Sequence, residues 1–277
     1  MRFVTVLPFL FSAALAAAPP NAISPDAVVS DIQQSALMGN LARLAKIAAN
    51  NGGNRAFGLP GYRASVDFVL ERVREFGKTV SVEEQPFEAL FAIVDDIKLN
   101  VVGGEDVYVI GLTYSPSTPP EGITAELALG PDGVGGCSAA GYEGGDVRGK
   151  IVLVQRFRCP DGTTLGGRVK AAVAAGASAV IIYHDLPTKP TAGTLTAPDP
   201  VAYRSAGFIS KADGEAWRAR IEAGETLQVY FRHLQTIENR TTWNVIAETK
   251  AGDPSSVIVV FPQFKVSIDR RRSLCAW

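Results

Sequence analysis

Histidine is scarce in this sequence. Its 277 residues include only two histidines, His184 and His233. A catalytic zinc centre or a Ser-His-Asp triad would have to draw on one of these residues or on neither. Neither histidine has a carboxylate neighbour at a metal-ligand spacing such as H-E-x-x-H. The composition therefore leaves few ways to build a zinc centre or a Ser-His-Asp triad in this chain.

An excess of charge of one sign is also lacking. The chain has 27 Lys and Arg residues against 28 Asp and Glu residues, for a net charge of −1. A nucleic-acid-binding protein needs a basic excess to neutralise phosphates, so the balance argues against that class. The Gly-rich loop at 130–145 does not match a phosphate-binding motif, and the chain contains no G-x-S-x-G nucleophile elbow.

Long hydrophobic runs are missing except at the start. Met1-Arg2 is followed by an apolar run over 3–15 and by the small-x-small sequence Ala14-Leu15-Ala16. This pattern predicts a secretory signal peptide over residues 1–16, and the run is too short for a membrane span. We therefore expect export, to the extracellular space or to a vacuolar lumen, without a membrane anchor.

Cysteine is limited to three residues. In an oxidising compartment a disulfide is the default, and we predict a Cys137–Cys159 pair that leaves Cys275 over. Zinc binding by three such dispersed cysteines is the poorer alternative. Asn239 begins the only N-x-[ST] sequon and is a candidate glycosylation site.

The N-terminal third is predicted to be helical. Ser24 is placed to cap a helix whose first residue is a proline. Apolar residues continue at helical spacing up to the Asn-Asn-Gly-Gly run at 50–53, with an interruption near Gly39. A second helix is predicted to begin at Pro60, and the alternation over 79–87 favours a strand.

From about Asn100 the sequence changes to short strands and many turns. The apolar runs 151–154 and 180–183 are typical of strands buried on both faces, and 164–175 between them is predicted to be a helix. This order favours a parallel βαβ unit with a right-handed crossover. The other predicted elements are a strand over 123–129, a helix capped by Ser210, and strands over 227–231, 243–247 and 257–260.

Both histidines follow predicted strands. His184 and Asp185 come after the 180–183 strand, at the end where α/β sheets often bind ligands, so a binding role is one interpretation. The interpretation that we favour is a loop histidine with a local hydrogen bond. His233 follows the 227–231 strand and is predicted to lie on the surface.

Two blocks of sequence together resemble a known family. The block 47–69, with Asn-Gly-Gly-Asn-Arg-Ala-Phe-Gly-Leu-Pro-Gly-Tyr, is similar to the N-terminal helical region of secreted and vacuolar zinc aminopeptidases of the aminopeptidase Y type. The block 136–177, with Asp-Val-Arg-Gly-Lys-Ile-Val-Leu-Val-Gln-Arg between its two cysteines, resembles the protease-associated (PA) domain inserted in those enzymes. Phe157 departs from that pattern, which usually has Gly there. Residues 242–249 are similar to the return into the peptidase sheet.

The resemblance implies an α/β fold, in which a β-rich PA domain with a βαβ unit is inserted into an incomplete α/β zinc-peptidase domain. The implied segments are a signal peptide at 1–16, peptidase helices at 24–99, a PA domain at 100–235, the first peptidase strands at 236–260 and an atypical tail at 261–277.

The family removes N-terminal amino acids from peptides and uses zinc, but one of its segments has no match here. After a strand like 257–260 the family continues with Gly-Ala-His-x-Asp-Ser, whereas this chain reads Phe261-Pro262-Gln263. No position matches a zinc ligand or a catalytic residue, so none is carried over and no cofactor is implied for this chain. We therefore expect a catalytically inactive family member, shortened by a misread splice junction or a frameshift near Val260.

Two alternatives remain open. The chain could be a noncatalytic module whose PA domain binds peptides or protein partners, with the 187–200 loop and the strand end at His184 and Asp185 as the candidate surface. The weaker alternative is an active enzyme completed by another chain.

Overall fold

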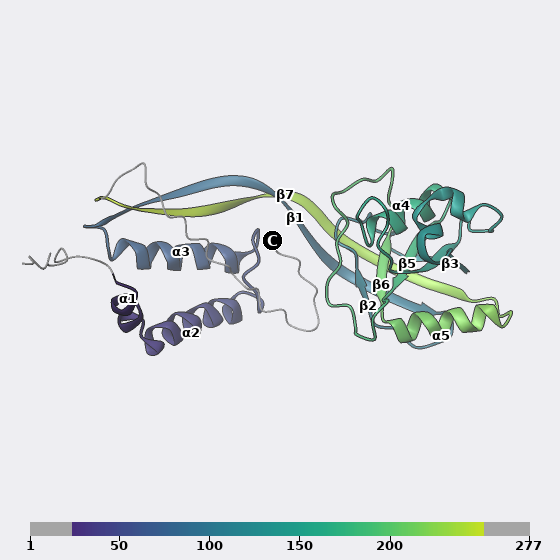
Figure 1. Ribbon diagram of the computed structural model, residues 1–277, viewed down its shortest axis with the longest axis horizontal. Helices are drawn as coiled ribbons and strands as arrows, with labels where there is room; N and C mark the ends of the chain where they lie inside the picture. The colour runs from purple at the N-terminus through teal and green to yellow at the C-terminus, as the bar shows by residue number, and fades with distance from the viewer. Residues whose placement is uncertain (1–23, 252–277) are drawn as a thin grey trace, which may run out of the picture. The chain divides into compact units, whose positions relative to one another are not determined.

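The computed structural model describes residues 24–251, shown in Figure 1. The predicted signal peptide, the predicted 257–260 strand, Cys275 and the 261–277 tail lie outside the described residues. The chain divides into two compact units, one up to Lys46 and one from Ile47 onward.

The first unit consists of helix α1, Pro25–Asp31, and most of helix α2, Gln34–Asn50. The predicted cap is present, since the Ser24 Oγ accepts a hydrogen bond from the Ala27 N–H at 3.1 Å. The predicted interruption near Gly39 is wrong, because Gly39 lies inside α2 and the break falls at Ile32, which has an extended backbone. A single glycine costs a helix only about 1 kcal/mol, so it does not by itself end one.

In the second unit, a helix packs on a long two-stranded ribbon (Figure 1). Helix α3, Pro60–Arg74, begins at Pro60 as predicted and buries Val66, Phe68 and Leu70. It contacts both strands of the ribbon, β1 at Val80–Val101 and β7 at Gln228–Thr249. The Tyr62 hydroxyl donates a hydrogen bond to the Trp243 carbonyl oxygen at 2.8 Å and fixes the helix to β7.

The two ribbon strands are much longer than predicted. They pair antiparallel from Val80 opposite Thr249 to Val101 opposite Val229, with one irregularity between Val94 and Asp96. The predicted strands 227–231 and 243–247 are therefore parts of one continuous strand, β7.

A seven-stranded mixed sheet organises the second unit, in the order β1-β7-β3-β4-β5-β6-β2. The four strands β3 to β6 are parallel, and β7 and β2 flank them in antiparallel pairings. Helix α4 connects β4 to β5, so the predicted βαβ unit and the α/β fold class are confirmed. The bounds are β2 Val109–Gly111, β3 Ile123–Leu129, β4 Ile151–Gln155, α4 Gly166–Ala174, β5 Ala179–Tyr183 and β6 Ala206–Ile209.

Helices α4 and α5 bury opposite faces of the central strands. Val152 and Val154 pack with Val169 of α4 in one core cluster, whereas Leu153 packs with Trp217 of α5, Lys211–Glu222, in the other. Successive strand residues point to opposite faces, which explains why β4 and β5 are apolar at almost every position. The predicted Ser210 cap is present, with Ser210 Oγ accepting from the Asp213 N–H at 3.1 Å.

Two short 3₁₀ turns, η1 Gly133–Cys137 and η2 Ala139–Tyr142, lie between β3 and β4. Among residues 24–251, no helix is both long and apolar enough to span a bilayer. Loops and turns follow the carboxyl ends of β3, β4 and β5, and many of the polar side chains in the second unit lie on these connections.

Candidate functional site

An ion pair follows the neighbouring strands β4 and β5. Arg156 comes directly after β4, and its Nη1 donates to both carboxylate oxygens of Asp185 at 2.9 and 3.1 Å. Burial opposes ionisation of the Asp185 carboxyl and is the largest single influence on its pKa. The hydrogen bond from Arg156, a bond from the Asp185 backbone N–H and the nearby positive charge together outweigh burial and lower the pKa. Asp185 is thus held as an anion by an arginine, which suits an orienting role better than proton transfer.

His184 is the locally bonded loop histidine that the sequence predicted. Its Nδ1 accepts the Leu186 N–H at 2.9 Å, and its ring stacks on Phe208 with centroids 5.1 Å apart. An Asp185 oxygen also lies 2.9 Å from Nδ1, an approach that is favourable only where Nδ1 carries a hydrogen. We assign the bond to Leu186, because its N–H points at the same nitrogen and needs an acceptor.

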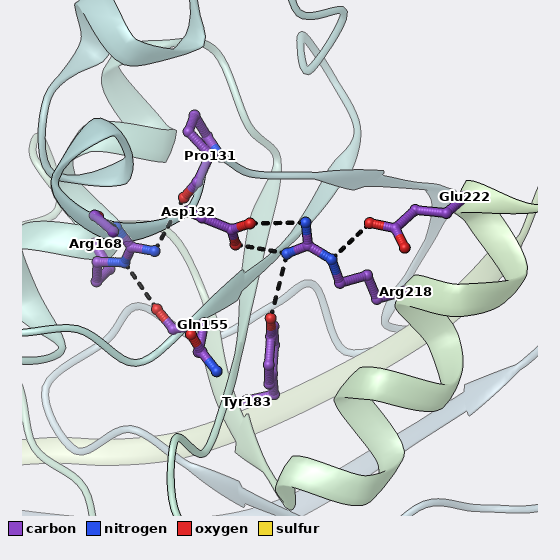
Figure 2. Close-up of polar contacts among 8 residues, drawn as sticks. Pro131, Asp132, Gln155, Arg168, Tyr183, Arg218 and Glu222 are labelled. Atoms are coloured by element: carbon purple, nitrogen blue, oxygen red, sulfur yellow. Dashed lines mark hydrogen bonds and ion pairs between the residues drawn. The ribbon is translucent and has the colours of Figure 1, made fainter.

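Arg218 of α5 joins three elements, as Figure 2 shows. Its Nη1 and Nη2 contact the two oxygens of Asp132 at 2.5 and 2.8 Å, and its Nε donates to Glu222 at 2.7 Å. The Tyr183 hydroxyl lies 3.4 Å from Nη1. These bonds, that to Asp132 first, raise the pKa of Arg218. The bidentate pair fastens the β3–β4 connection to α5.

Arg168 of α4 binds the same connection and is completely buried (Figure 2). Its Nη1 donates to the Gly133 carbonyl oxygen at 2.6 Å, its Nη2 to that of Pro131 at 3.1 Å and its Nε to that of Gln155 at 2.9 Å. Burial lowers the pKa of this guanidinium. Two arginines, from helices on opposite faces of the sheet, thus fix the segment 131–133.

The predicted disulfide is confirmed between Cys137 and Cys159. It links the turn η1 to the segment after β4, with the two Cα atoms 5.6 Å apart. Cys159 is only 4% exposed, whereas Cys137 is half-buried. Closing a loop of this length stabilises a fold by about 3 kcal/mol in the chain-entropy account. The disulfide and Arg168 therefore fasten the same connection.

The predicted surface position of His233 is wrong. His233 is 0% exposed, and burial lowers its pKa to about 4. Its Nδ1 lies 3.2 Å from the Ser205 hydroxyl oxygen and 3.4 Å from that of Ser115. The physical reason is that β7 continues past Phe231. Alternate residues of a strand point to the same face, so His233 points inward like Val229 and Phe231.

The backbone of β2 passes directly over the His233 ring. A Cβ added at Gly111 would lie 2.2 Å from Nε2 of His233, so only glycine fits at that position. Nearby, Tyr114 has a φ of 72°, and its N–H donates to Gln235 Oε1 at 3.2 Å. We call Ser115, Ser205, His233 and Gln235 the His233 cluster. It is too enclosed to receive a substrate and serves to join β7 to the neighbouring loops.

Asn239 is exposed on β7, opposite Leu90 of β1. The side chain is accessible, but its glycosylation stays a prediction.

The described residues do not fit a zinc centre. Within the part of the chain that the structure covers, no three His, Cys, Asp or Glu side chains are grouped to hold a metal ion. The Nδ1 of His233 faces two hydroxyls, the Nδ1 of His184 faces a backbone N–H, and Asp185 is paired with Arg156. Zinc sites instead gather three or four such donors around one point.

This chain is similar to known proteins, both within one domain and over most of its length. A family model described as the PA domain matches residues 123–217, from β3 to within α5. The probable lipoprotein aminopeptidase LpqL of Mycobacterium tuberculosis is 34% identical over 232 residues, which cover 82% of this chain and 43% of the relative. Leucine aminopeptidase 2 of Arthroderma otae is 35% identical over 241 residues, 86% of this chain and 45% of the relative. The chain thus spans less than half the length of these relatives.

Solved structures show the same relationship. The aminopeptidase from Aneurinibacillus sp. strain AM-1 is 29% identical with a TM-score of 0.58, over 76% of this chain and 47% of that one. The zinc aminopeptidase BSAP from Bacillus subtilis has 24% identity and a TM-score of 0.52, over 75% and 44% of the two chains, and supports the fold. The resemblance predicted from the sequence is confirmed, and the chain is a relative of the M28-type zinc aminopeptidase family that carries a PA domain.

Proposed function

We propose that this chain is a noncatalytic aminopeptidase relative that binds peptides or proteins through its PA domain and does not itself remove N-terminal residues. Residues 100–235 form the PA domain in this proposal, and 24–99 and 236–260 belong to the peptidase part. The observation that carries the proposal is the commitment of both histidines to other contacts. The disulfide is consistent with an oxidising compartment, so we place the protein outside the cell or in a vacuolar lumen.

The catalytic half of the proposal is tested by metal content and turnover. We expect the purified chain to contain substoichiometric zinc by mass spectrometry and to release no chromophore from leucyl-p-nitroanilide after zinc is added. An active zinc aminopeptidase assayed in parallel is the control. Stoichiometric zinc together with turnover that a chelator abolishes would contradict the proposal and favour an intact catalytic site.

The binding half rests on exposed apolar side chains at the end of the parallel strands. Phe157 follows Arg156 and is 39% exposed, and Leu186 follows Asp185 and is 53% exposed. The Arg156–Asp185 ion pair holds these two segments together. Apolar side chains presented beside an oriented ion pair suit a peptide with an apolar residue and a charged terminus.

Peptide binding is expected to depend on Leu186. A Leu186→Asp substitution should weaken binding of leucine-containing peptides about tenfold in titration calorimetry, the loss that follows from removing ~1.4 kcal/mol of apolar contact. The matched control is Val201→Asp, because Val201 is 84% exposed on the same β5–β6 connection but lies outside the proposed surface. Equal effects of the two substitutions would remove Leu186 from the binding surface.

A further inference from the structure

The two sulfurs of the disulfide are in unequal surroundings. Cys159 is buried against the first turn of α4, where a Cβ added at Gly167 would lie 3.0 Å from the Cys159 sulfur. Cys137 lies in the η1 turn and is half-buried, so it is the more exposed of the two residues. In thiol–disulfide exchange, access decides which sulfur an incoming thiolate attacks.

A cation also lies beside the sulfur of the more exposed cysteine. Arg168 Nη1 is 3.9 Å from Cys137 Sγ, while the rest of the guanidinium is fixed by carbonyl oxygens. A fixed positive charge attracts an incoming thiolate and stabilises the negative charge that spreads over three sulfurs during exchange. Cys159 precedes helix α4 in the chain, but its sulfur packs against the first turn of that helix, so it is the sulfur better placed to leave as a thiolate.

We propose that Cys137 is a thiol-modification site, the sulfur at which a small thiol such as glutathione enters the disulfide. The glutathione thiolate forms a bond to Cys137 Sγ as the Cys137–Cys159 bond breaks, and Cys159 leaves with the electron pair and is protonated by solvent. A second glutathione thiolate then displaces Cys137 from the mixed disulfide. The protein gains two electrons, and two glutathione molecules are oxidised to one glutathione disulfide.

The fold around the site does not depend on the disulfide alone. Arg168 binds the Pro131 and Gly133 carbonyl oxygens, and Arg218 binds Asp132, so the η1 connection stays attached after the bond opens. The mixed disulfide is therefore a state of the folded protein, in which η1 carries a glutathione.

The experiment traps the intermediate in the full chain. A Cys275→Ser background removes the third thiol. The folded protein is incubated with reduced glutathione, quenched with N-ethylmaleimide and mapped by peptide mass spectrometry. We expect glutathione on Cys137 and maleimide on Cys159. Glutathione mainly on Cys159, or a disulfide untouched by glutathione under native conditions, would overturn the proposal.

A second measurement compares the reactivity of the two thiols when each is free. Cys159→Ser and Cys137→Ser, each in the Cys275→Ser background, leave one of the two thiols free. We expect iodoacetamide to react with Cys137 at least ~10-fold faster than with Cys159 at pH 7, because Cys137 is half-buried whereas Cys159 is only 4% exposed. Faster reaction of Cys159 contradicts the proposal, and the trapping result decides if either variant does not fold.

Discussion

Replacing Arg168 with methionine is expected to lower the free energy of unfolding by about 3–5 kcal/mol. Methionine fills a similar volume but donates no hydrogen bond. The carbonyl oxygens of Pro131, Gly133 and Gln155 would then lose their guanidinium partner. The loss is measured as a lower urea midpoint at pH 7, with the disulfide intact.

Two substitutions test the cause of this loss. Arg158→Met removes the same charge from an exposed side chain one residue before the disulfide and should change stability by less than about 0.5 kcal/mol. Arg168→Lys retains a cation but not the planar fork, so it should fall between wild type and Arg168→Met. If Arg168→Met is as mild as Arg158→Met, the guanidinium is not what holds the 131–133 segment.

The central sheet could be predicted because its signals are local. The apolar runs at 151–154 and 180–183 are too short for helices and too apolar for half-exposed strands, so they identified β4 and β5. Ser210 identified the start of α5 through the chemistry of helix caps. In each of these cases the burial pattern along the chain agrees with the intrinsic preference of its residues.

The ribbon could not be predicted at its true length. The middle of β7, around Thr236 and Glu238, is polar and partly exposed on both faces, so its side chains show no alternation. These residues form a strand because β1 supplies backbone partners, as Thr236 opposite Ile93 illustrates. Pairing between segments far apart in the chain leaves little trace in either segment alone.

In the candidate site, too, the local features could be predicted and the contacts between distant segments could not. The Cys137–Cys159 pair and the local bond of His184 follow from compartment and chain position, and both were predicted. Arg168 was missed, although it lies four residues before Ala172 and so shares the inward face of α4. The helical pattern could have shown that Arg168 faces inward. It could not have shown the carbonyl partners of Arg168, because their positions depend on where β3 and β4 end.

His233 is expected to make the protein less stable in mild acid. In the unfolded chain this histidine takes up a proton as the pH falls through about 6.5, whereas in the folded protein it stays neutral down to about 4. Between these values the unfolded state binds more protons, so the free energy of unfolding falls as the pH falls. The contribution is complete above pH 6.5 and is lost by pH 4, and it amounts to about 3 kcal/mol.

The measurement compares urea unfolding at pH 7 and pH 4.5 for wild type, His233→Gln and His184→Gln. Glutamine cannot take up a proton, so His233→Gln should lose about 2 kcal/mol less than wild type over this interval. His184→Gln is the matched control, because it removes the only other histidine and leaves the His233 cluster intact. It should retain most of the wild-type acid sensitivity.

Carboxylates contribute to acid sensitivity in all three proteins, and their part cancels in the comparison. Asp185 has a lowered pKa through its bond from Arg156, and the stability that it provides is lost only as the pH falls through that lowered value. A wild-type loss that persists unchanged in His233→Gln would therefore assign the sensitivity to carboxylates. A loss that is reduced only in His233→Gln would show that the buried ring resists protonation, because burial between two hydroxyls and the Gly111 backbone disfavours its charged form.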